Sequence, residues 1–448
     1  MKEEVSDIEA KKKSALKVSI AEGSANSIST GISNAYITPF ALKLSSNDLN
    51  IGILSSVSGL ISPLAQLYGS KLMEKYSRKK IVVASMLWQT IMWLPLIIIA
   101  FLKFYGVYVS SLIYLLIIFY TVFSALSGLY YPPWFSWMGD LINEKDRGRY
   151  FGKRNTILGL IELFSVLLAT AILRFGENTS YELISFATIF SICLIGRFLS
   201  FMIIQGQYTP HAKSRKTYAM KISDLIRENK DYRRFSIYQM FFNISIMIAS
   251  PFFAVYMLQN LNFGYWSYIL VTISSSVFYL VFTPIVGKFS DKYGNVRLLV
   301  LANVLFALTP LLWMFIKSPI ELILIPQMIS GLANAALILS FTNFSYDYLT
   351  EEERGVGIAY ANILSGIGIF IGSIVGGILL EYINISFINK FIFVFAIAAI
   401  LRAAVALIFL PSIKEKKKVN RIPPMYVSLL HPYRSIQAEI GWIRHVFK

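Results

Sequence analysis

The chain has 448 residues, of which 56% are hydrophobic and only 15% are charged, and its mean hydropathy is +0.59. About a quarter of the residues of an ordinary soluble domain are charged, so this composition excludes a soluble globular protein. The net charge of +17 could indicate nucleic-acid binding, but no surface motif of aromatic and basic residues accompanies it. We therefore expect no nucleic-acid partner.

The apolar runs are continuous rather than alternating, which excludes a β-barrel. Ile81–Leu102 and Phe235–Leu258 each exceed 20 residues without a formal charge. As helices, such runs are long enough to cross a hydrocarbon layer of about 30 Å. We predict an all-α polytopic membrane protein with twelve transmembrane helices, near Ser19–Leu42, Leu49–Gly69, Ile81–Leu102, Leu112–Trp134, Phe151–Ile172, Leu183–Ile204, Phe235–Leu258, Ser267–Phe289, Val296–Ile316, Ile320–Ser345, Val356–Leu380 and Phe387–Leu410.

The charges predict the orientation of these spans. The N-terminal residues have no short apolar core followed by a cleavage site, so we expect no signal peptide. When both termini are placed in the cytosol, the cytosolic connections hold most of the basic residues and carry the whole net charge of +17. This distribution follows the positive-inside rule. We predict a multi-pass protein of the cell membrane with both termini cytosolic.

The longest connection, 205–234, is basic and divides the spans into two sets of six. Features recur across this division in the same order: Glu74 and Asp291 are 217 positions apart, and Asp140 and Asp347 are 207 positions apart. Such self-similarity indicates a duplication. We predict a cytosolic arm at 1–18, six-helix bundles at 19–204 and 235–410 that are related by pseudo-symmetry, the central loop, and a basic amphipathic tail at 411–448.

The duplicated loops resemble the signature of the major facilitator superfamily of secondary transporters. The pattern Gly-x-Leu-x-Asp-Arg-x-Gly-Arg is matched well at Gly287–Gly294 and loosely at Ser70–Arg78, where Ser70 and Ser77 replace glycines and Glu74 replaces aspartate. The resemblance implies two six-helix bundles that rock about a central site lined by spans 1, 4, 7 and 10. The motifs of proton-coupled members in span 4, of drug antiporters in span 5 and of sugar porters are missing, so the subfamily stays open.

The cytosolic loops of both halves carry acids and arginines that can pair. We expect them to form an inner latch between the bundles, with turn formation and topology as the alternative role. The residues of this predicted latch are Glu74, Arg78, Asp140, Arg147, Asp291, Asp347 and Arg354.

Glu162 is the sharpest single feature, because it lies about eleven residues into span 5 and close to the membrane midplane. An ionised carboxylate is costly there, so it should be protonated, paired or in contact with water. We expect a proton-coupling or cation-recognising site, with a structural hydrogen bond or an ion pair with Arg197 as the alternatives. Glu22, one turn into span 1, suits the start of a helix and could join a proton path.

Further polar residues lie within the spans. We expect Arg197 and its repeat Arg402 to anchor their spans by reaching the inner interface with their long side chains, with contact to the substrate as the alternative. Four residues at mid-depth on spans 1, 4, 7 and 10 can contact a solute, although hydrogen bonds between helices are the default for such groups. These candidate solute contacts are Asn34, Tyr120, Asn243 and Asn334.

The sequence argues against catalysis in the membrane. It has no phosphate-binding Gly-x-x-x-x-Gly-Lys loop, one cysteine, and histidines only in cytosolic segments, so we expect neither an enzyme nor a cofactor or metal. The tail places Ile436, Ile440, Ile443 and Phe447 on one face beside basic residues, which favours binding to anionic lipids of the inner leaflet, with a partner-binding helix as the alternative.

We therefore predict a monomeric secondary transporter that moves a small organic solute by alternating access. We expect coupling to protons through Glu162 and favour efflux of a neutral, amphipathic or cationic solute. The alternatives are an uptake permease for a small metabolite, and a non-transporting sensor or lipid scramblase built on the same fold.

Overall fold

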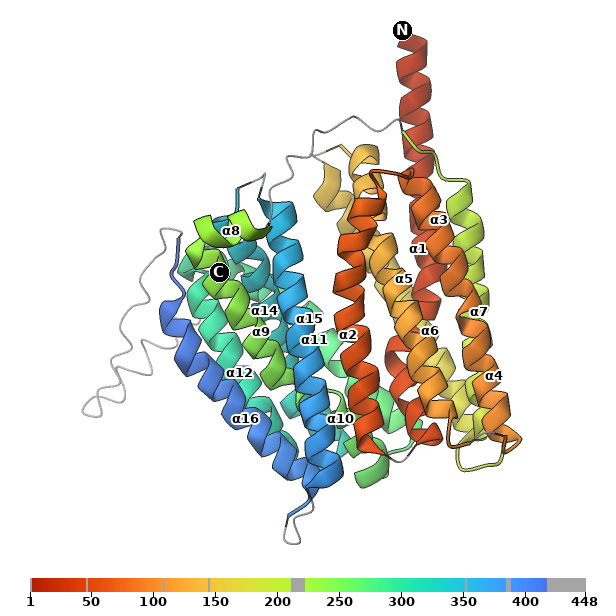
Figure 1. Cartoon of the computed structure of the whole chain (residues 1–448), viewed down its shortest axis with the longest axis vertical. Helices are drawn as coiled ribbons and strands as arrows, with labels where there is room; N and C mark the ends of the chain where they lie inside the picture. The colour runs from red at the N-terminus through yellow and green to blue at the C-terminus, as the bar shows by residue number, and fades with distance from the viewer. Residues whose placement is uncertain are drawn as a thin grey trace, which may run out of the picture. The chain divides into compact units, whose positions relative to one another are not determined.

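The computed structural model describes residues 2–45, 47–107, 109–143, 146–210, 222–350, 353–383 and 388–416. In these ranges the regular structure is helical and contains no strand (Figure 1). The helices are α1 (Lys2–Leu44), α2 (Asp48–Leu72), α3 (Arg78–Ile91), α4 (Trp93–Phe104), α5 (Leu112–Leu141), α6 (Arg147–Gly176), α7 (Glu182–Gln205), α8 (Ile222–Glu228), α9 (Lys230–Met247), α10 (Phe252–Val255), η2 (Tyr256–Asn260), α11 (Tyr265–Tyr293), α12 (Asn295–Phe315), α13 (Pro319–Leu322), η3 (Ile323–Gln327), α14 (Met328–Tyr348), α15 (Arg354–Tyr382), α16 (Lys390–Phe409) and η4 (Leu410–Ser412).

Within the described ranges, 11 helical stretches are long and apolar enough to cross a membrane. They correspond to predicted spans 2–12, with α3 and α4 forming one span and α13, η3 and α14 another. The predicted first span lies in α1, which is more polar because its central turns carry serines, asparagines and Glu22. The all-α prediction is confirmed, and α1 supplies the twelfth predicted span.

Several helices extend beyond the predicted spans into the aqueous segments. The predicted arm 1–18 belongs largely to α1, which runs as one helix from Lys2. The seventh span begins at Lys230 instead of Phe235, and the predicted central loop contains the short helix α8. Hydropathy marks the apolar length of a helix but not its ends, because helical hydrogen bonding continues into polar sequence.

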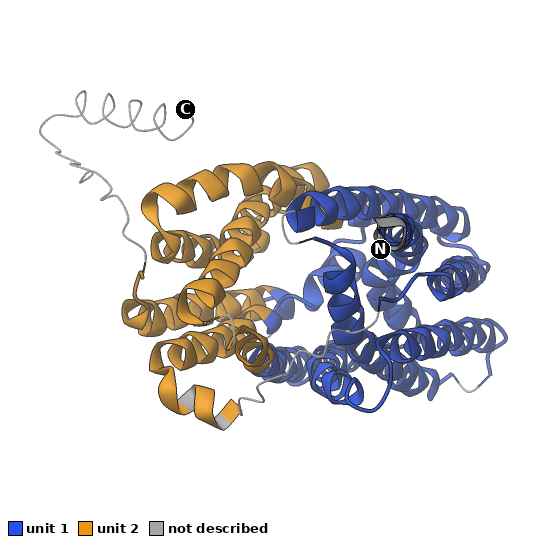
Figure 2. Cartoon of the chain, turned by 90° about the horizontal axis from the view of Figure 1, so that it is seen from above, with its two compact units in different colours: residues 1–218, 247–270, 362–391 blue, residues 219–246, 271–361, 392–448 orange. Residues whose placement is uncertain are grey.

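The chain divides into two compact units (Figure 2). Unit 1 comprises residues 1–218, 247–270 and 362–391, and unit 2 comprises residues 219–246, 271–361 and 392–448. Two segments of the predicted second bundle thus pack in the unit that contains α1–α7.

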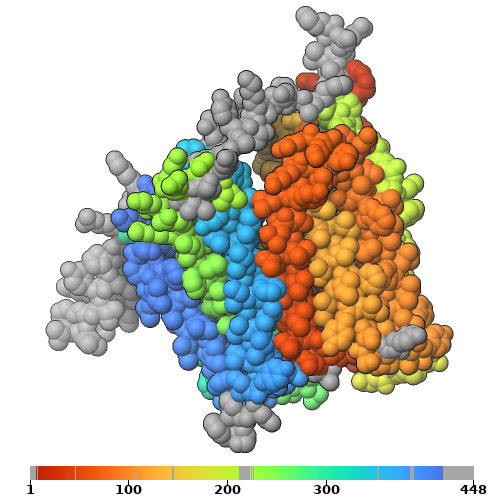
Figure 3. Space-filling view, in the orientation of Figure 1, coloured from red at the N-terminus to blue at the C-terminus, as the bar shows by residue number. Residues whose placement is uncertain are grey.

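Unit 1 joins the first seven helices to the two later segments. Its buried core includes Trp134, Trp137 and Met86, contributed by α5 and α3. The part of α15 that belongs to this unit lies beside α2 (Figure 3), where Ser373 and Ser55 are linked through their hydroxyl oxygens at 3.3 Å. Asn47, which caps α2, donates to the carboxylate of Glu381 at 2.9 Å. Polar contacts therefore accompany apolar packing in this unit.

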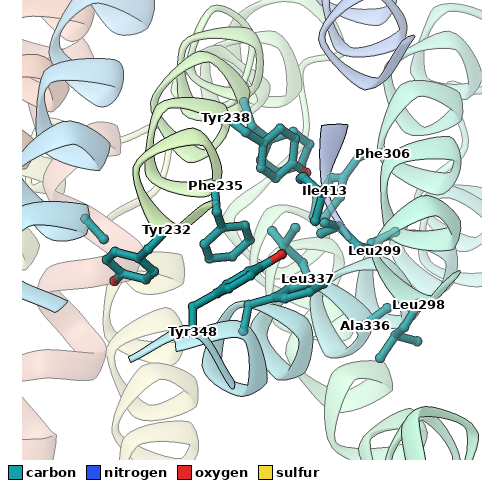
Figure 4. Packing of buried hydrophobic residues seen from close by; sticks show 14 of the residues in the cluster. Tyr232, Phe235, Tyr238, Leu298, Leu299, Phe306, Ala336, Leu337, Tyr348 and Ile413 are labelled. Atoms are coloured by element: carbon teal, nitrogen blue, oxygen red, sulfur yellow. The ribbon is translucent and has the colours of Figure 1, made fainter. Parts of the chain in front are cut away.

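Unit 2 has an aromatic core (Figure 4). The rings of Phe235 and Phe344 lie 4.9 Å apart, and Tyr238 and Tyr348 pack in the same buried cluster. Ile413, which follows the last span, is 6% exposed and belongs to this cluster. The core thereby fixes a residue of the segment beyond the membrane helices.

Many large apolar side chains point outward from the helices in the described ranges. Phe175, Leu280 and Leu407 are 87%, 68% and 78% exposed. Apolar exposure on this scale, over many turns of long helices, is typical of a surface that faces lipid. It agrees with the membrane spans inferred from length and composition.

Candidate functional site

The candidate functional residues lie at different depths along the helices. We call the end at which α1 ends, at Leu44, the outer end and the opposite end the inner end, following the orientation that the charge distribution predicts. Glu162 lies near the middle of α6, between the two ends. The site therefore has three levels: the middle around Glu162, the inner loops and the outer mouth of unit 1.

The packing of α1 on α6 sets the position of Glu162. A Cβ atom on Gly31 would lie 2.7 Å from the Cγ atom of Glu162, so only glycine allows this approach. The side chain of Asn34, one turn further along α1, lies within hydrogen-bonding reach of the Glu162 carboxylate. Glu162 is half-buried and Asn34 is exposed. The two predicted site residues therefore meet at a partly open position.

Glu162 has no basic partner in the described part of unit 1. The ion pairs there involve other acids, and the predicted alternative partner Arg197 donates instead to Asn26 on α1. A carboxylate within a membrane span that no arginine or lysine neutralises must obtain a positive charge from elsewhere. A proton or the cationic group of a solute can supply it.

The other mid-depth candidates are divided between the units. Tyr120 on α5 lies near Ser33, the residue before Asn34. Asn243 and Asn334 belong to unit 2, where their amide groups donate to the backbone carbonyls of Gln239 and Ser330 in their own helices. The structure thus brings Asn34, Tyr120 and Glu162 around α1 and does not add the other two to them.

A buried charge cluster near the inner end was not predicted as such. Glu22 is 0% exposed, accepts a hydrogen bond from Ser200 at 2.9 Å, and lies 3.7 Å from the guanidinium of Arg154. Arg154 also covers the ring of Trp134 at 4.7 Å. Arg197 donates to Asn26 and lies over the ring of Tyr130. The signal was present, because Glu22 and Arg154 each lie one turn into parallel spans.

The prediction that Arg197 and Arg402 reach the interface is wrong, since each is 2% exposed. Arg402 donates to the carbonyls of Ser245 and Ile246 at 3.4 and 3.2 Å and to that of Phe306 at 2.8 Å. Helix α9 ends at Met247, so its last carbonyls have no helical donor. Pro310 has no N–H, which frees the carbonyl of Phe306 four residues earlier. Arg402 satisfies these interior acceptors.

The predicted latch residues lie near helix ends and in the connections between helices in each unit. In unit 1, Arg78 pairs with Asp140 at 2.7 Å, and Arg147 donates to the carbonyl of Gly139 at 3.3 Å. Glu74 and Asp291 are exposed.

In unit 2, Asp347 accepts a hydrogen bond from Asn295 at 3.0 Å. Arg354 covers the ring of Tyr346 at 4.8 Å. These contacts orient individual latch residues within each unit, and the latch itself stays a prediction.

The outer mouth of unit 1 holds a second set of polar contacts that sequence reasoning missed. The hydroxyl of Tyr265 donates to Glu182 at 2.6 Å, and its backbone N–H donates to Glu177 at 2.9 Å. Lys43 and Arg174 pair with these acids at 2.8 and 2.6 Å. The first residue of α11 is thereby bound to α7 and to the loop before it.

Aromatic contacts continue this closure inward. The hydroxyl of Tyr268 donates to the carbonyl of Ala35 at 2.8 Å, and the rings of Tyr36 and Tyr265 meet edge to face at 6.3 Å. The residues of this outer mouth line a polar cavity of about 480 Å³, whose walls include Lys43 and Gly264. Segment 247–270 therefore closes on the first helices at the outer end. We call the contacts of Tyr265 and Tyr268 with these helices the outer gate.

No group of three or more histidine, cysteine or carboxylate side chains that could hold a metal ion occurs among the described residues. Cys193 is buried in α7. The predicted lipid-binding face with Ile436, Ile440, Ile443 and Phe447 lies outside the described residues. The functional chemistry of the described site rests on carboxylates, arginines and aromatic rings.

Comparison with known proteins identifies the class to which this arrangement belongs. The profile of the Major Facilitator Superfamily matches residues 23–228 and 235–438, which is most of the chain. The structure is similar to that of a variant of the nucleoside transporter NupG, with a TM-score of 0.70 over 89% of this chain and 100% of that one, at 16% identity. The chain belongs to the Major Facilitator Superfamily, and it is a multi-pass membrane transporter rather than an enzyme.

Curated relatives match shorter stretches. The vacuolar basic amino acid transporter 1 of Saccharomyces cerevisiae is 31% identical over 148 residues, which are 32% of this chain and 26% of that protein. Multidrug resistance protein 1 of Bacillus subtilis is 27% identical over 142 residues, which are 32% of this chain and 35% of that protein. The matched stretches thus cover about a third or less of these relatives' own length.

Proposed function

We propose that this transporter exports a small organic solute by alternating access and that Glu162 couples the export to protons. The carboxylate of Glu162 carries the proposal, because it lies at mid-span, is half-buried and has no basic partner in the described part of unit 1. One negative charge can be neutralised by one positive group at a time. A proton and a cationic solute would therefore compete for Glu162, and such competition produces exchange.

The proposed solute is amphipathic and is cationic or neutral. The carboxylate of Glu162 would bind a cationic group, while Tyr120 and Asn34 offer a ring face and an amide beside it. The relatives agree with this class, since one is named for basic amino acids and another for multidrug resistance. A multiply charged anion would meet Glu162 as a like charge.

Alternating access requires closure at each end in turn. The outer gate is the closed end in unit 1, where Tyr265 and Tyr268 bind segment 247–270 to the first helices. We propose that the predicted latch residues close the inner end when this gate opens. Ion pairs at exposed positions are worth only about 0–1 kcal/mol, which suits contacts that must break in every cycle.

The test is transport into sealed vesicles with an imposed pH gradient, using ethidium as the lipophilic cation and radiolabelled arginine as the basic amino acid. In Glu162→Gln we expect gradient-driven accumulation to fall at least tenfold, because the amide takes up no proton. Exchange of either cationic probe without a gradient should weaken as well, because the neutral amide cannot pair with a positive group. Glu321→Gln is the matched control, since Glu321 is an exposed acid outside the site.

Three outcomes separate the candidate functions. Accumulation that follows the gradient in the parent and is lost only in Glu162→Gln supports coupled transport through this residue. Equal accumulation in parent and Glu162→Gln removes Glu162 from the coupling step. Movement of labelled lipid without any gradient, with neither probe transported, would instead support a scramblase.

A further inference from the structure

The first N–H groups of a helix have no acceptor within the helix, and the two copies of the signature loop supply one in different ways. In the first copy, Ser77 precedes α3 and its hydroxyl accepts the N–H of Lys80. In the second, the corresponding residue is Gly294, which has a φ of 93° and no side chain to act as a cap. The first N–H groups of α12 therefore need an acceptor from elsewhere.

Glu415, in the segment after the last span, supplies that acceptor. Its Oε2 atom accepts the backbone N–H of Val296 at 2.8 Å. A carboxylate at this position also meets the positive end of the helix dipole of α12. Glu415 is thus placed where the missing side chain of Gly294 would have acted.

The segment that carries Glu415 is held at two further points. Ile413 is buried in the core of unit 2 beside Leu299 (Figure 4). The hydroxyl of Tyr348 donates to the backbone carbonyl of Lys414 at 2.8 Å. Three consecutive residues therefore bind to α12, α14 and the core, which makes the position of the Glu415 carboxylate well defined.

Asn295, the neighbour of Val296, relays this position to the latch. It is 0% exposed, donates to Asp347 at 3.0 Å, and accepts from Asn343 at 2.8 Å and from the hydroxyl of Ser290. Because both ends of its amide are in use, Asn295 cannot rotate without breaking a buried hydrogen bond. Movement of the start of α12 must therefore move Asp347.

We propose that Glu415 is a positioning residue of the inner latch, which holds the start of α12 and, through Asn295, sets the orientation of Asp347. The proposal rests on the alternating-access function proposed above. It makes the segment after span 12 a working part of the inner end, although no loop motif includes it. Release of Glu415 would free α12 and Asp347 together.

Hydrogen exchange on the full-length protein in lipid nanodiscs tests this without any solute. In Glu415→Ala we expect exchange to become at least tenfold faster in peptides that cover 295–299 and 343–348. Glu415→Gln should stay within about threefold of the parent, because the amide oxygen still accepts the N–H of Val296. Lys414→Ala is the matched neighbour, since its side chain is exposed and its backbone carbonyl is kept.

The start of α3, which Ser77 caps, is the internal reference and should not change. Faster exchange at 295–299 alone would overturn the relay to Asp347 and leave a helix cap. Unchanged exchange in Glu415→Ala, or an equal rise throughout the chain, would overturn the proposal entirely.

Truncation gives a second readout. A chain that ends at Ser412 should show faster exchange at 295–299 and 343–348 than a chain that ends at Lys416, which keeps Ile413, Lys414 and Glu415. Equal exchange in the two truncated chains would also overturn the role of this segment. In the vesicle assay, Glu415→Ala should lower the maximal rate at an unchanged apparent affinity. If the parent shows no gradient-driven transport, the proposed function is refuted. The hydrogen-exchange result would still decide whether Glu415 positions Asp347.

Discussion

Replacement of Arg402 by methionine should destabilise the folded protein by about 3 kcal/mol, one of the two largest effects that we expect. The guanidinium of Arg402 donates to the backbone carbonyls of Ser245, Ile246 and Phe306, and Arg402 is buried. A buried acceptor without a donor costs about 1–3 kcal/mol. Relief of the desolvated charge offsets part of this loss, since burying a guanidinium is itself unfavourable.

Unfolding can be followed through Cys193, which is the single cysteine of the chain and is buried. A fluorogenic thiol reagent therefore reacts only when the fold opens. Arg402→Lys should lose less stability than Arg402→Met, because one ammonium can still reach one or two of the carbonyls. Equal stability of Arg402→Met and the parent would show that the carbonyls find other donors.

Replacement of Glu22 by alanine should cost about 3–5 kcal/mol, the usual effect of removing one partner from a buried charge pair. Glu22 is 0% exposed and faces Arg154 at 3.7 Å, while Arg154 and Arg197 are 7% and 2% exposed. Without the carboxylate, two buried guanidinium groups would remain with no acid between them. The same thiol assay measures the loss.

A double-mutant cycle separates the pair from other effects of the substitution. If Glu22 and Arg154 interact as the structure indicates, Glu22→Ala combined with Arg154→Leu should lose less stability than the sum of the two single losses. Strict additivity would mean that Glu22 acts through Ser200 alone, to which it is also hydrogen-bonded.

The fold could be predicted because the length of each apolar run, which decides whether a helix can cross the membrane, is read directly from the sequence. Runs such as Ile81–Leu102 can only be spans, and the more polar first span was also predicted, at Ser19–Leu42. Glu162 was found because a single carboxylate in an apolar run stands out. Its neighbour Asn34 followed from the family plan, but the close contact with Gly31 required the packing of α1 on α6.

The outer gate could not be predicted in this way. Glu177 and Glu182 read as ordinary loop acids, and only the return of Tyr265 to them creates the contact. The role of Arg402 was wrongly predicted because its acceptors are backbone carbonyls. Every residue has such a carbonyl, so residue types alone do not show which ones Arg402 will bind. Pro310 was the available signal, since it frees a carbonyl four residues earlier.

Covalent closure of the outer gate is the most direct test of alternating access. A Cβ atom on Gly264 would lie 3.6 Å from the carboxyl carbon of Glu177, so cysteines at these two positions lie within reach of a short, reducible thiol cross-linker. Transport of the probes should fall at least tenfold when the link forms and return on reduction, and each single-cysteine variant should be insensitive. Undiminished transport through a chain whose outer gate is covalently closed would contradict the account.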